Sequence, residues 1–173
     1  RGPRGEKAKI NYTVWSDVFI CPECGNEVVF YDTSVNPENG EVLDEFICTH
    51  CSSLLSKNGL SRATVTSYDS ALKKTVTTSK QIPVLINYSI GKKRGNKRPD
   101  EYDIALSKKI EELQIPWWYP VCELPQGDKT SDPRNSLINH IHQFYSKRNL
   151  YTLALAIHLS KKNRNDRFLL AQS

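Results

Sequence analysis

Two Cys-x-x-Cys pairs constrain this chain more than any other feature of its sequence. Cys21-Pro-Glu-Cys24 and Cys48-Thr-His-Cys51 are separated by 23 residues that read as a hairpin. Each pair presents two thiolates to one metal ion, and a hairpin would bring the second pair opposite the first. Four sulfur ligands form the tetrahedron that zinc prefers and leave no position for water. The spacing therefore predicts one structural zinc ion held by these four cysteines.

Two other uses of the cysteines are less consistent with the sequence. A secreted disulfide scaffold is disfavoured by the odd fifth cysteine, Cys122, by the low cysteine density and by the lack of a readable signal peptide. A redox enzyme does not usually need two such pairs. His50, inside the second pair, is an alternative ligand, although an exposed turn residue is the simpler interpretation. Cys122 is expected to be a lone buried thiol.

The rest of the chain predicts mixed secondary structure around this zinc ribbon. Asn36–Gly40 is a strong turn signal between two expected strands. Further Thr- and Val-rich segments predict a second, more polar hairpin and then a buried strand. The expected strands are 10–19, 27–34, 41–47, 62–67, 74–79 and 82–90.

Two amphipathic helices are expected near 100–114 and 147–162. In the first helix, apolar residues such as Tyr102, Leu106 and Ile110 recur at three-to-four spacing. The fold class is therefore α+β, a four-cysteine zinc ribbon with β-hairpins followed by a small mixed α/β region with two helices. We expect a linker at 1–9, a zinc-ribbon module at 10–60, and an α+β region at 61–173 that contains a basic loop at 91–98.

Composition indicates a soluble protein. Hydrophobic residues make up 38% and charged residues 25%, and no run approaches the roughly 18 apolar residues of a membrane span. We therefore expect a cytoplasmic protein with no membrane partner. The chain contains no Met, and it stops in an apolar segment, 168–173. These two features indicate a piece of a larger protein.

A basic run is the second candidate site. The formal net charge is +5, and five of the seven residues from Lys92 to Arg98 are cationic. On a Gly-containing loop, such residues can follow a phosphate backbone. A solvated loop beyond a strand end is the alternative. The candidate nucleic-acid ligands are Lys92, Lys93, Arg94, Lys97 and Arg98.

Three further segments have a chemical and a structural interpretation. The aromatic residues 117–119 can stack on bases, but the flanking prolines favour a core plug. His140 and His142 would share one face of a strand, where hydrogen-bonded histidines are more plausible than a metal pair without further ligands. Residues 147–149 can bind an anion or simply begin a helix. No nucleotide-binding, hydrolase or metalloprotease motif is present, so no catalytic centre can be assembled.

Several segments across the chain resemble one group of large bacterial DNA methyltransferases, of the kind found in restriction–modification systems. That group methylates the exocyclic amine of adenine or cytosine with S-adenosylmethionine, and it carries a zinc-ribbon insert after its cofactor-binding motif. The similar segments are 10–25, 83–94, 99–103, 115–120 and 142–150.

The resemblance implies the insert and not the catalytic core. The Asp-Pro-Phe-x-Gly-Ser-Gly cofactor motif and the Asp/Asn-Pro-Pro-Tyr/Phe catalytic motif of that group are absent. No catalytic residue is therefore carried over, and S-adenosylmethionine would be bound only by the parent enzyme. The expected function is DNA-binding and target recognition, with duplex DNA and the rest of the methyltransferase chain as partners. The alternatives are a structural or protein-interaction zinc module of the methylase, and an unrelated zinc-ribbon RNA-binding or transcription protein.

Overall fold

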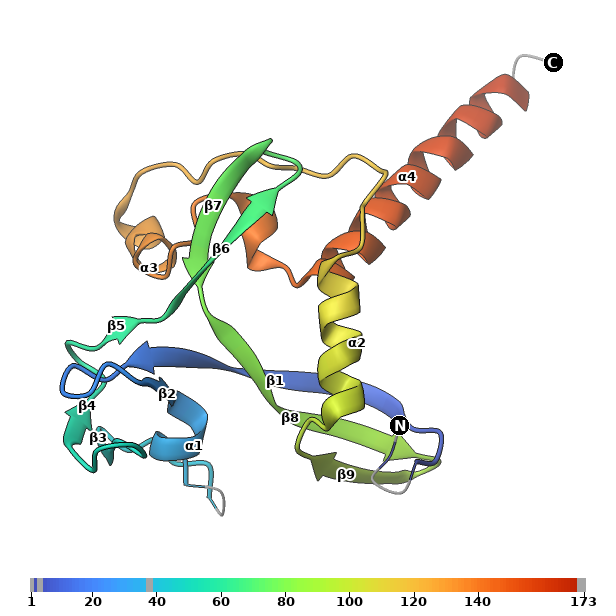
Figure 1. Cartoon of the computed structure of the whole chain (residues 1–173). Coiled ribbons are helices and arrows are strands. Elements are labelled where there is room, and N and C mark those ends of the chain that lie inside the picture. Colours follow the sequence, from blue (N-terminus) through green and yellow to red (C-terminus); the bar gives the residue numbers. More distant parts are fainter. Residues whose placement is uncertain (1, 3–4, 37–38, 171–173) are drawn as a thin grey trace. The chain divides into compact units, whose positions relative to one another are not determined.

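The computed structural model describes residues 2, 5–36 and 39–170, with side chains as far as residue 163. It shows a mixed α+β protein with mainly antiparallel pairing (Figure 1). The chain divides into two compact units, 1–67 with 75–104 and 68–74 with 105–173. The elements are β1 (Lys9–Ile20), β2 (Glu27–Val29), α1 (Phe30–Ser34), β3 (Glu45–Ile47), β4 (Leu54–Ser56), β5 (Ser61–Arg62), β6 (Thr64–Asp69), β7 (Lys74–Ser79), β8 (Gln81–Ile90), β9 (Lys93–Lys97), α2 (Glu101–Glu111), η1 (Asp128–Thr130), α3 (Ser131–Asn135), η2 (Ile141–Phe144) and α4 (Lys147–Leu170).

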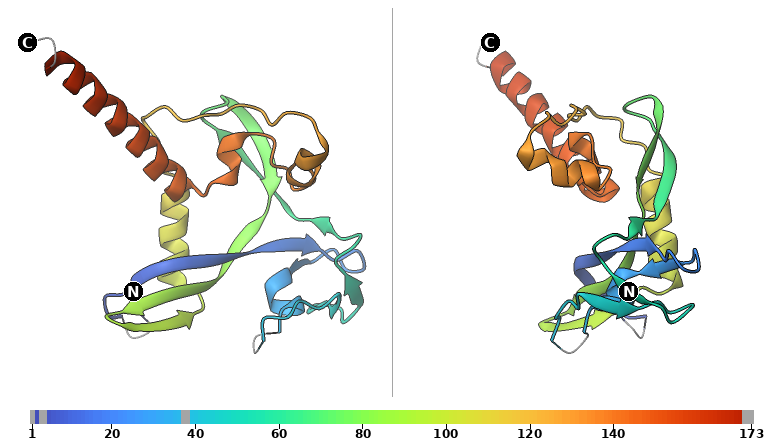
Figure 2. Two further views of the ribbon diagram at one scale, coloured as in Figure 1. Left: turned by 180° about the vertical axis from the view of Figure 1, so that it is seen from behind. Right: turned by 90° about the vertical axis from the view of Figure 1, so that its left-hand side faces the viewer.

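The first unit is organised by β1, the longest of the described strands. Most of its length pairs with β8, and its last residues pair with β2 and with β5. The sheet order is β2-β1-β8-β9, which leaves β9 at an edge (Figure 2). Val84 and Ile86, two residues apart on β8, are buried on one face, as expected for a half-buried sheet. Val18 and Phe19 are buried at the end of β1.

The prediction of a basic loop at 91–98 is wrong, because most of this segment is a strand. Lys93–Lys97 forms β9, which pairs antiparallel with the end of β8. Gly91 makes the tight turn at φ +57°, a conformation that favours glycine. Cationic side chains are common on edge strands, where they discourage pairing with another chain. A run of charge therefore does not exclude a strand.

The predicted hairpin between the cysteine pairs is also wrong. Each pair lies instead in the turn of its own hairpin, β1–β2 for the first and β3–β4 for the second. The expected strand at 27–34 ends at Val29, and α1 follows it. The hydroxyl of Ser16 accepts a hydrogen bond from the Tyr31 N–H at 2.9 Å and so satisfies a donor in the first turn of α1. This partner is 15 residues away, so local sequence gives no sign of it.

The expected strand at 41–47 is reduced to β3. Before it, Val35 and Val42 form an isolated bridge, and the Gly40 N–H donates to the Asn36 carbonyl at 2.9 Å. Pro37 and Glu38 of the predicted turn lie outside the described residues. The strands expected at 10–19, 74–79 and 82–90 are confirmed as β1, β7 and β8, whereas the one at 62–67 is divided between β5 and β6.

The helix α2 is present, but its predicted apolar face is exposed. Asp100 and Asp103 form a reciprocal cap, in which each carboxylate accepts the other's backbone N–H at 2.9 and 3.1 Å. The helix ends at Glu111, three residues earlier than expected. Tyr102 is 50% exposed and Leu106 is 38% exposed. The three-to-four spacing of apolar residues therefore predicted the helix correctly. It did not predict which side chains are buried, since Tyr102 and Leu106 are exposed.

The second unit contains α3, the two 3-10 helices, all of α4 and most of α2. Among the side chains that the structure describes in this unit, the buried apolar ones are Leu150 and Ala154 of α4. As predicted, α4 begins at Lys147, and the Ser146 carbonyl accepts its first described bond from Leu150. The helix continues to Leu170, about two turns beyond the expected end. None of the helices in the described part of the chain combines the length and hydropathy needed to span a bilayer.

Candidate metal centre and cationic sheet face

The four predicted cysteine ligands come together. Their sulfur atoms all lie within 4.8 Å of one another. The Sγ atoms of Cys21 and Cys51 are 3.7 Å apart, and those of Cys24 and Cys48 are 3.9 Å apart. A tetrahedron with zinc–sulfur bonds of about 2.3 Å has sulfur–sulfur edges of about 3.8 Å, whereas a disulfide bond is about 2.05 Å. Two of the sulfur–sulfur distances therefore match the edges of a tetrahedral site, and the four cysteines together could hold a metal ion.

The two cysteine turns share one backbone pattern. In the first, the Gly25 N–H donates to the Cys21 carbonyl at 2.9 Å. In the second, the Ser52 N–H donates to the Cys48 carbonyl at 3.0 Å. The N–H of each leading cysteine also bonds to the carbonyl five residues later, at 2.9 Å. Two equivalent turns thus present equivalent pairs of sulfur atoms.

The cysteines also belong to a small hydrophobic core. Cys21 and Cys48 are buried with Val28, Phe46 and Leu55, one residue from each of β2, β3 and β4. The ring of Phe30 meets Phe46 edge-on with centroids 5.6 Å apart. A core of this size is too small to stabilise the module without a further contribution. Metal binding by the cysteine cluster would supply it.

Without metal, the thiols have different acidities. Burial raises the pKa of Cys21 to about 11. A hydrogen bond from the Ser53 hydroxyl, 3.1 Å from the Cys51 sulfur, together with the Ser53 N–H, lowers the pKa of Cys51 to about 6. Ser53 is a residue that sequence analysis did not single out. Its hydroxyl stabilises the thiolate that metal binding requires.

Two predictions about residues near the cysteines have different outcomes. The backbone N–H of His50 approaches the Cys48 sulfur at 3.5 Å, while its side chain is outside the four-residue metal cluster. His50 is exposed, in accordance with the simpler interpretation. Cys122 is exposed as well, so the prediction of a buried thiol is wrong.

The five predicted cations fall into two groups. The side chain of Lys97 is only 8% exposed, and it forms ion pairs with Asp103 at 2.5 Å and with Asp100 at 2.8 Å. Although burial opposes its charge, the two carboxylates raise the pKa of Lys97. Arg98 pairs with Asp32 of α1 at 2.6 Å. Lys97 and Arg98 therefore connect elements of the first unit.

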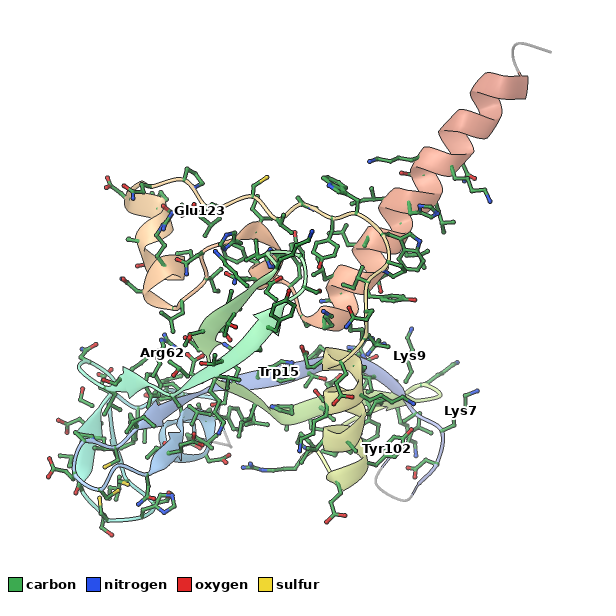
Figure 3. The ribbon with its side chains drawn as sticks, turned by 45° about the horizontal axis from the view of Figure 1, so that its top comes forward. Lys7, Lys9, Trp15, Arg62, Tyr102 and Glu123 are labelled. Atoms are coloured by element: carbon green, nitrogen blue, oxygen red, sulfur yellow. The ribbon has the colours of Figure 1, made fainter. Side chains whose placement is uncertain are left out.

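The remaining three cations, Lys92, Lys93 and Arg94, are exposed at the β8–β9 turn and the start of β9. No carboxylate of the described residues forms an ion pair with them. Two further cations, which were not among the predicted site residues, lie at the same end of the sheet. Lys7 and Lys9 are exposed, and their side chains extend away from the ribbon (Figure 3). The pairing register shows the connection, because Lys9 is opposite Ser89, which is opposite Arg94.

The aromatic residues 117–119 do not form one site. Trp117 is half-buried and packs edge-on against Tyr151, with ring centroids 5.2 Å apart. It also stacks on the ring of His158, with centroids 5.9 Å apart. Trp118 is 65% exposed, with the Lys161 ammonium 4.7 Å from its ring centre. The prediction that these aromatic residues pack into the protein interior therefore agrees with the contacts of Trp117 but not with the exposure of Trp118.

The two histidines are not on one strand. His140 forms an isolated bridge with Glu123, and His142 lies in η2 with its ring 5.8 Å from that of His140. The Nε2 atom of the buried His142 is 2.7 Å from the Asp69 carboxylate. Burial raises the pKa of Asp69, but hydrogen bonds from His142 and from two backbone N–H groups lower it overall. For His142, this geometry agrees with the hydrogen-bonded interpretation.

Comparisons with protein-family models, with curated proteins and with solved structures found no match for this chain. Its function must therefore be inferred from the residues themselves. They establish a four-cysteine cluster able to bind a metal ion, and a sheet edge with unpaired cations.

Proposed function

We propose that this chain is a zinc-stabilised module that binds duplex DNA. The observation that carries the proposal is the division of the cationic run, since Lys97 and Arg98 are held by carboxylates while Lys92, Lys93 and Arg94 are not. Together with Lys7 and Lys9, the unpaired cations make one end of the β1–β8–β9 sheet strongly positive. Duplex DNA is the occupant with matching negative charge.

Zinc is the metal that fits the cysteine cluster. Four thiolates favour a thiophilic ion, and zinc accepts four such ligands in tetrahedral geometry. With all four positions filled by protein, the ion would have no site for water or substrate. Its role would be to hold the β1–β2 and β3–β4 hairpins against one another.

The wider proposal is that the chain is the recognition segment of a bacterial DNA methyltransferase. Its basis is the sequence resemblance of several segments. In that setting the catalytic domain would lie elsewhere in the parent enzyme and would flip out and methylate the base. The present chain would contribute binding and no catalytic residue.

A salt titration tests the DNA-binding proposal. Affinity of the zinc-loaded chain for a random-sequence duplex should fall with rising salt, with a log–log slope of about −0.9 per phosphate contact. Replacing Lys92, Lys93 and Arg94 by Gln should make the slope less steep by up to about 2.7. A matched control replaces Lys108, Lys109 and Lys162, which are exposed cations of the second unit, by Gln.

The outcomes separate the candidate functions. Absence of binding at low salt, or an equal change of slope in the control, would contradict the DNA-binding proposal. Stronger competition by duplex RNA than by duplex DNA would instead favour the RNA-binding alternative.

One observation favours the protein-interaction alternative. Ile47 and Leu54 are directly opposite each other on β3 and β4, and they are 59% and 65% exposed. An exposed cross-strand apolar pair of this kind suits contact with another protein surface. Replacing both by Thr should leave DNA binding intact. If the module instead braces a parent enzyme, the same change should weaken its association with the rest of that enzyme.

A further inference from the structure

One face of the β1–β8–β9 sheet carries a continuous network of neutral polar side chains. The Asn11 Nδ2 donates to the Asn87 Oδ1 at 2.8 Å, and the Asn87 Nδ2 donates to the Asn96 Oδ1 at 2.6 Å. Asn11 also exchanges hydrogen bonds with the Ser89 hydroxyl at 2.9 and 3.3 Å. Three neighbouring strands each contribute an amide, and all of these bonds are exposed to solvent.

The pairing register places these groups on the same side of the sheet. Asn87 is opposite Asn96, and Ser89 is opposite Arg94, two residues along each strand. Because side chains alternate between faces, positions two apart share a face. A bulge in β1 between Ile10 and Tyr12 brings Asn11 into line with β8. The network is therefore a property of the sheet register and not a random collection of loop residues.

The network has a direction, and it ends at the sheet edge. Amide donors run from β1 through β8 to β9, where Asn96 is exposed. The Asn96 Oδ1 is fixed by Asn87, so the position of its Nδ2 is fixed as well. That Nδ2 has no partner among the described residues, and Oδ1 retains a second lone pair. Asn96 thus offers a donor and an acceptor side by side in a pre-ordered orientation.

This pair of groups matches one nucleic-acid feature well. In the major groove, adenine presents an N7 acceptor beside an N6 donor, and an Asn side chain bonds both. Antiparallel β structure can enter that groove, and Asn96 lies on β9, the edge strand, which pairs with β8 while β8 pairs with β1 on its other side. The nearby cations Arg94 and Lys9 share the row of Ser89, where they can contact phosphates on either side.

We infer that this amide-bearing face reads base edges in duplex DNA, with Asn96 contacting an adenine in the major groove. The inference rests on the proposed DNA binding and adds a second element to it. The cations Lys7, Lys9, Lys92, Lys93 and Arg94 supply affinity that is independent of sequence, and the amide network supplies the preference for an A·T pair. Because the network already orders Asn96, little side-chain entropy is lost on binding.

Selection from a random duplex library tests the inference. The zinc-loaded chain should enrich a motif that contains at least one fixed A·T pair. Asn96→Ala should lower the preference for that pair about tenfold or more, while the salt slope on random duplex stays unchanged. Asn58→Ala, a change of an exposed amide outside the network, is the matched control and should retain the motif.

A second variant separates base contact from folding. Asn96→Asp keeps the acceptor for Asn87 but removes the outward donor, so it should lose the same A·T preference with an unchanged melting temperature. Binding without any enriched motif, or a motif unaffected by both Asn96 variants, would overturn the inference and leave the proposed DNA binding intact. No binding to any duplex at low salt would overturn both. Preference for single-stranded DNA of the same sequence would also overturn the inference, because single-stranded DNA has no major groove.

Discussion

Ser52 occupies the same position in the second cysteine turn that Gly25 occupies in the first. Both have left-handed backbone conformations, at φ +61° and +72°, and both donate their N–H to the carbonyl of the leading cysteine. A side chain is strained in this conformation, whereas glycine is not. The two halves of the metal site therefore differ in backbone strain.

We expect Ser52→Gly to stabilise the module by about 0.5–1 kcal/mol, because relief of strain exceeds the entropy that glycine adds to the unfolded chain. Gly25→Ala should destabilise it by about 1 kcal/mol. A Cβ at Gly25 meets no atom within 4 Å, so the effect reports the backbone alone. Denaturant titration of the zinc-loaded variants measures both changes in the free energy of unfolding. If the two substitutions changed stability equally and in the same direction, Ser52 would not be strained relative to Gly25.

Removal of metal should unfold the cysteine module, because zinc binding by such sites provides about 10–16 kcal/mol. Addition of a strong chelator should abolish the protected amides of β2, β3 and β4 in hydrogen exchange. Cobalt substitution should give the absorption of a tetrahedral four-thiolate site. Cys51→Ser should lose this spectrum, whereas Cys122→Ser, which changes an exposed cysteine outside the cluster, should retain it.

Lys97 and Lys92 should behave differently although they belong to the same basic run. Lys97→Gln leaves the buried Asp103 without its cationic partner and should cost about 1–3 kcal/mol of stability. Lys92→Gln should change stability by less than about 0.5 kcal/mol, because the residue is exposed. Thermal unfolding checks the stabilities, and the salt slope of DNA binding should change for Lys92→Gln. A stable Lys97→Gln protein would show that the ion pairs are dispensable.

Acid should weaken the start of α2. Hydrogen bonds from Lys97 and from the Asp103 backbone lower the pKa of Asp100 to about 2. A carboxylate whose pKa is lower in the folded state than in the unfolded state contributes stability above the unfolded value of about 4, and it loses that contribution as pH falls through about 2. Asp100→Asn should therefore flatten the pH dependence of unfolding between about pH 4 and 2. If the pH dependence of the free energy of unfolding did not change in Asp100→Asn, Asp100 would not contribute to the loss of stability in acid.

The cysteine cluster could be predicted from sequence because its spacing is local and its chemistry is restrictive. Cys21 and Cys24 have few alternative uses at this separation, and the same holds for the second pair. Helix positions could be predicted as well, since the capping residue Asp100 and the start at Lys147 are local signals. These features could be predicted because the residues that determine them are close together in the sequence.

Other features depend on partners distant in the chain, and for these the sequence was insufficient. The Tyr31 N–H at the start of α1 bonds to Ser16, 15 residues away, and Arg98 pairs with Asp32, 66 residues away. The amide network unites Asn11 and Asn87, which are 76 residues apart. No pattern in a single sequence brings these residues together, because their proximity is a result of the sheet register.

The pairing of β1 with β8 has a kinetic consequence. The two strands are joined by the 60 residues between Ile20 and Gln81, which include both cysteine turns. Closing a flexible segment of this length is entropically costly, and slow sheet formation follows from such distant pairing. A metal ion that binds early would shorten the free segment by joining Cys21 to Cys51. Zinc would then accelerate the pairing of β1 with β8, although neither strand supplies one of its ligands, and refolding in its absence should be slower as well as less complete.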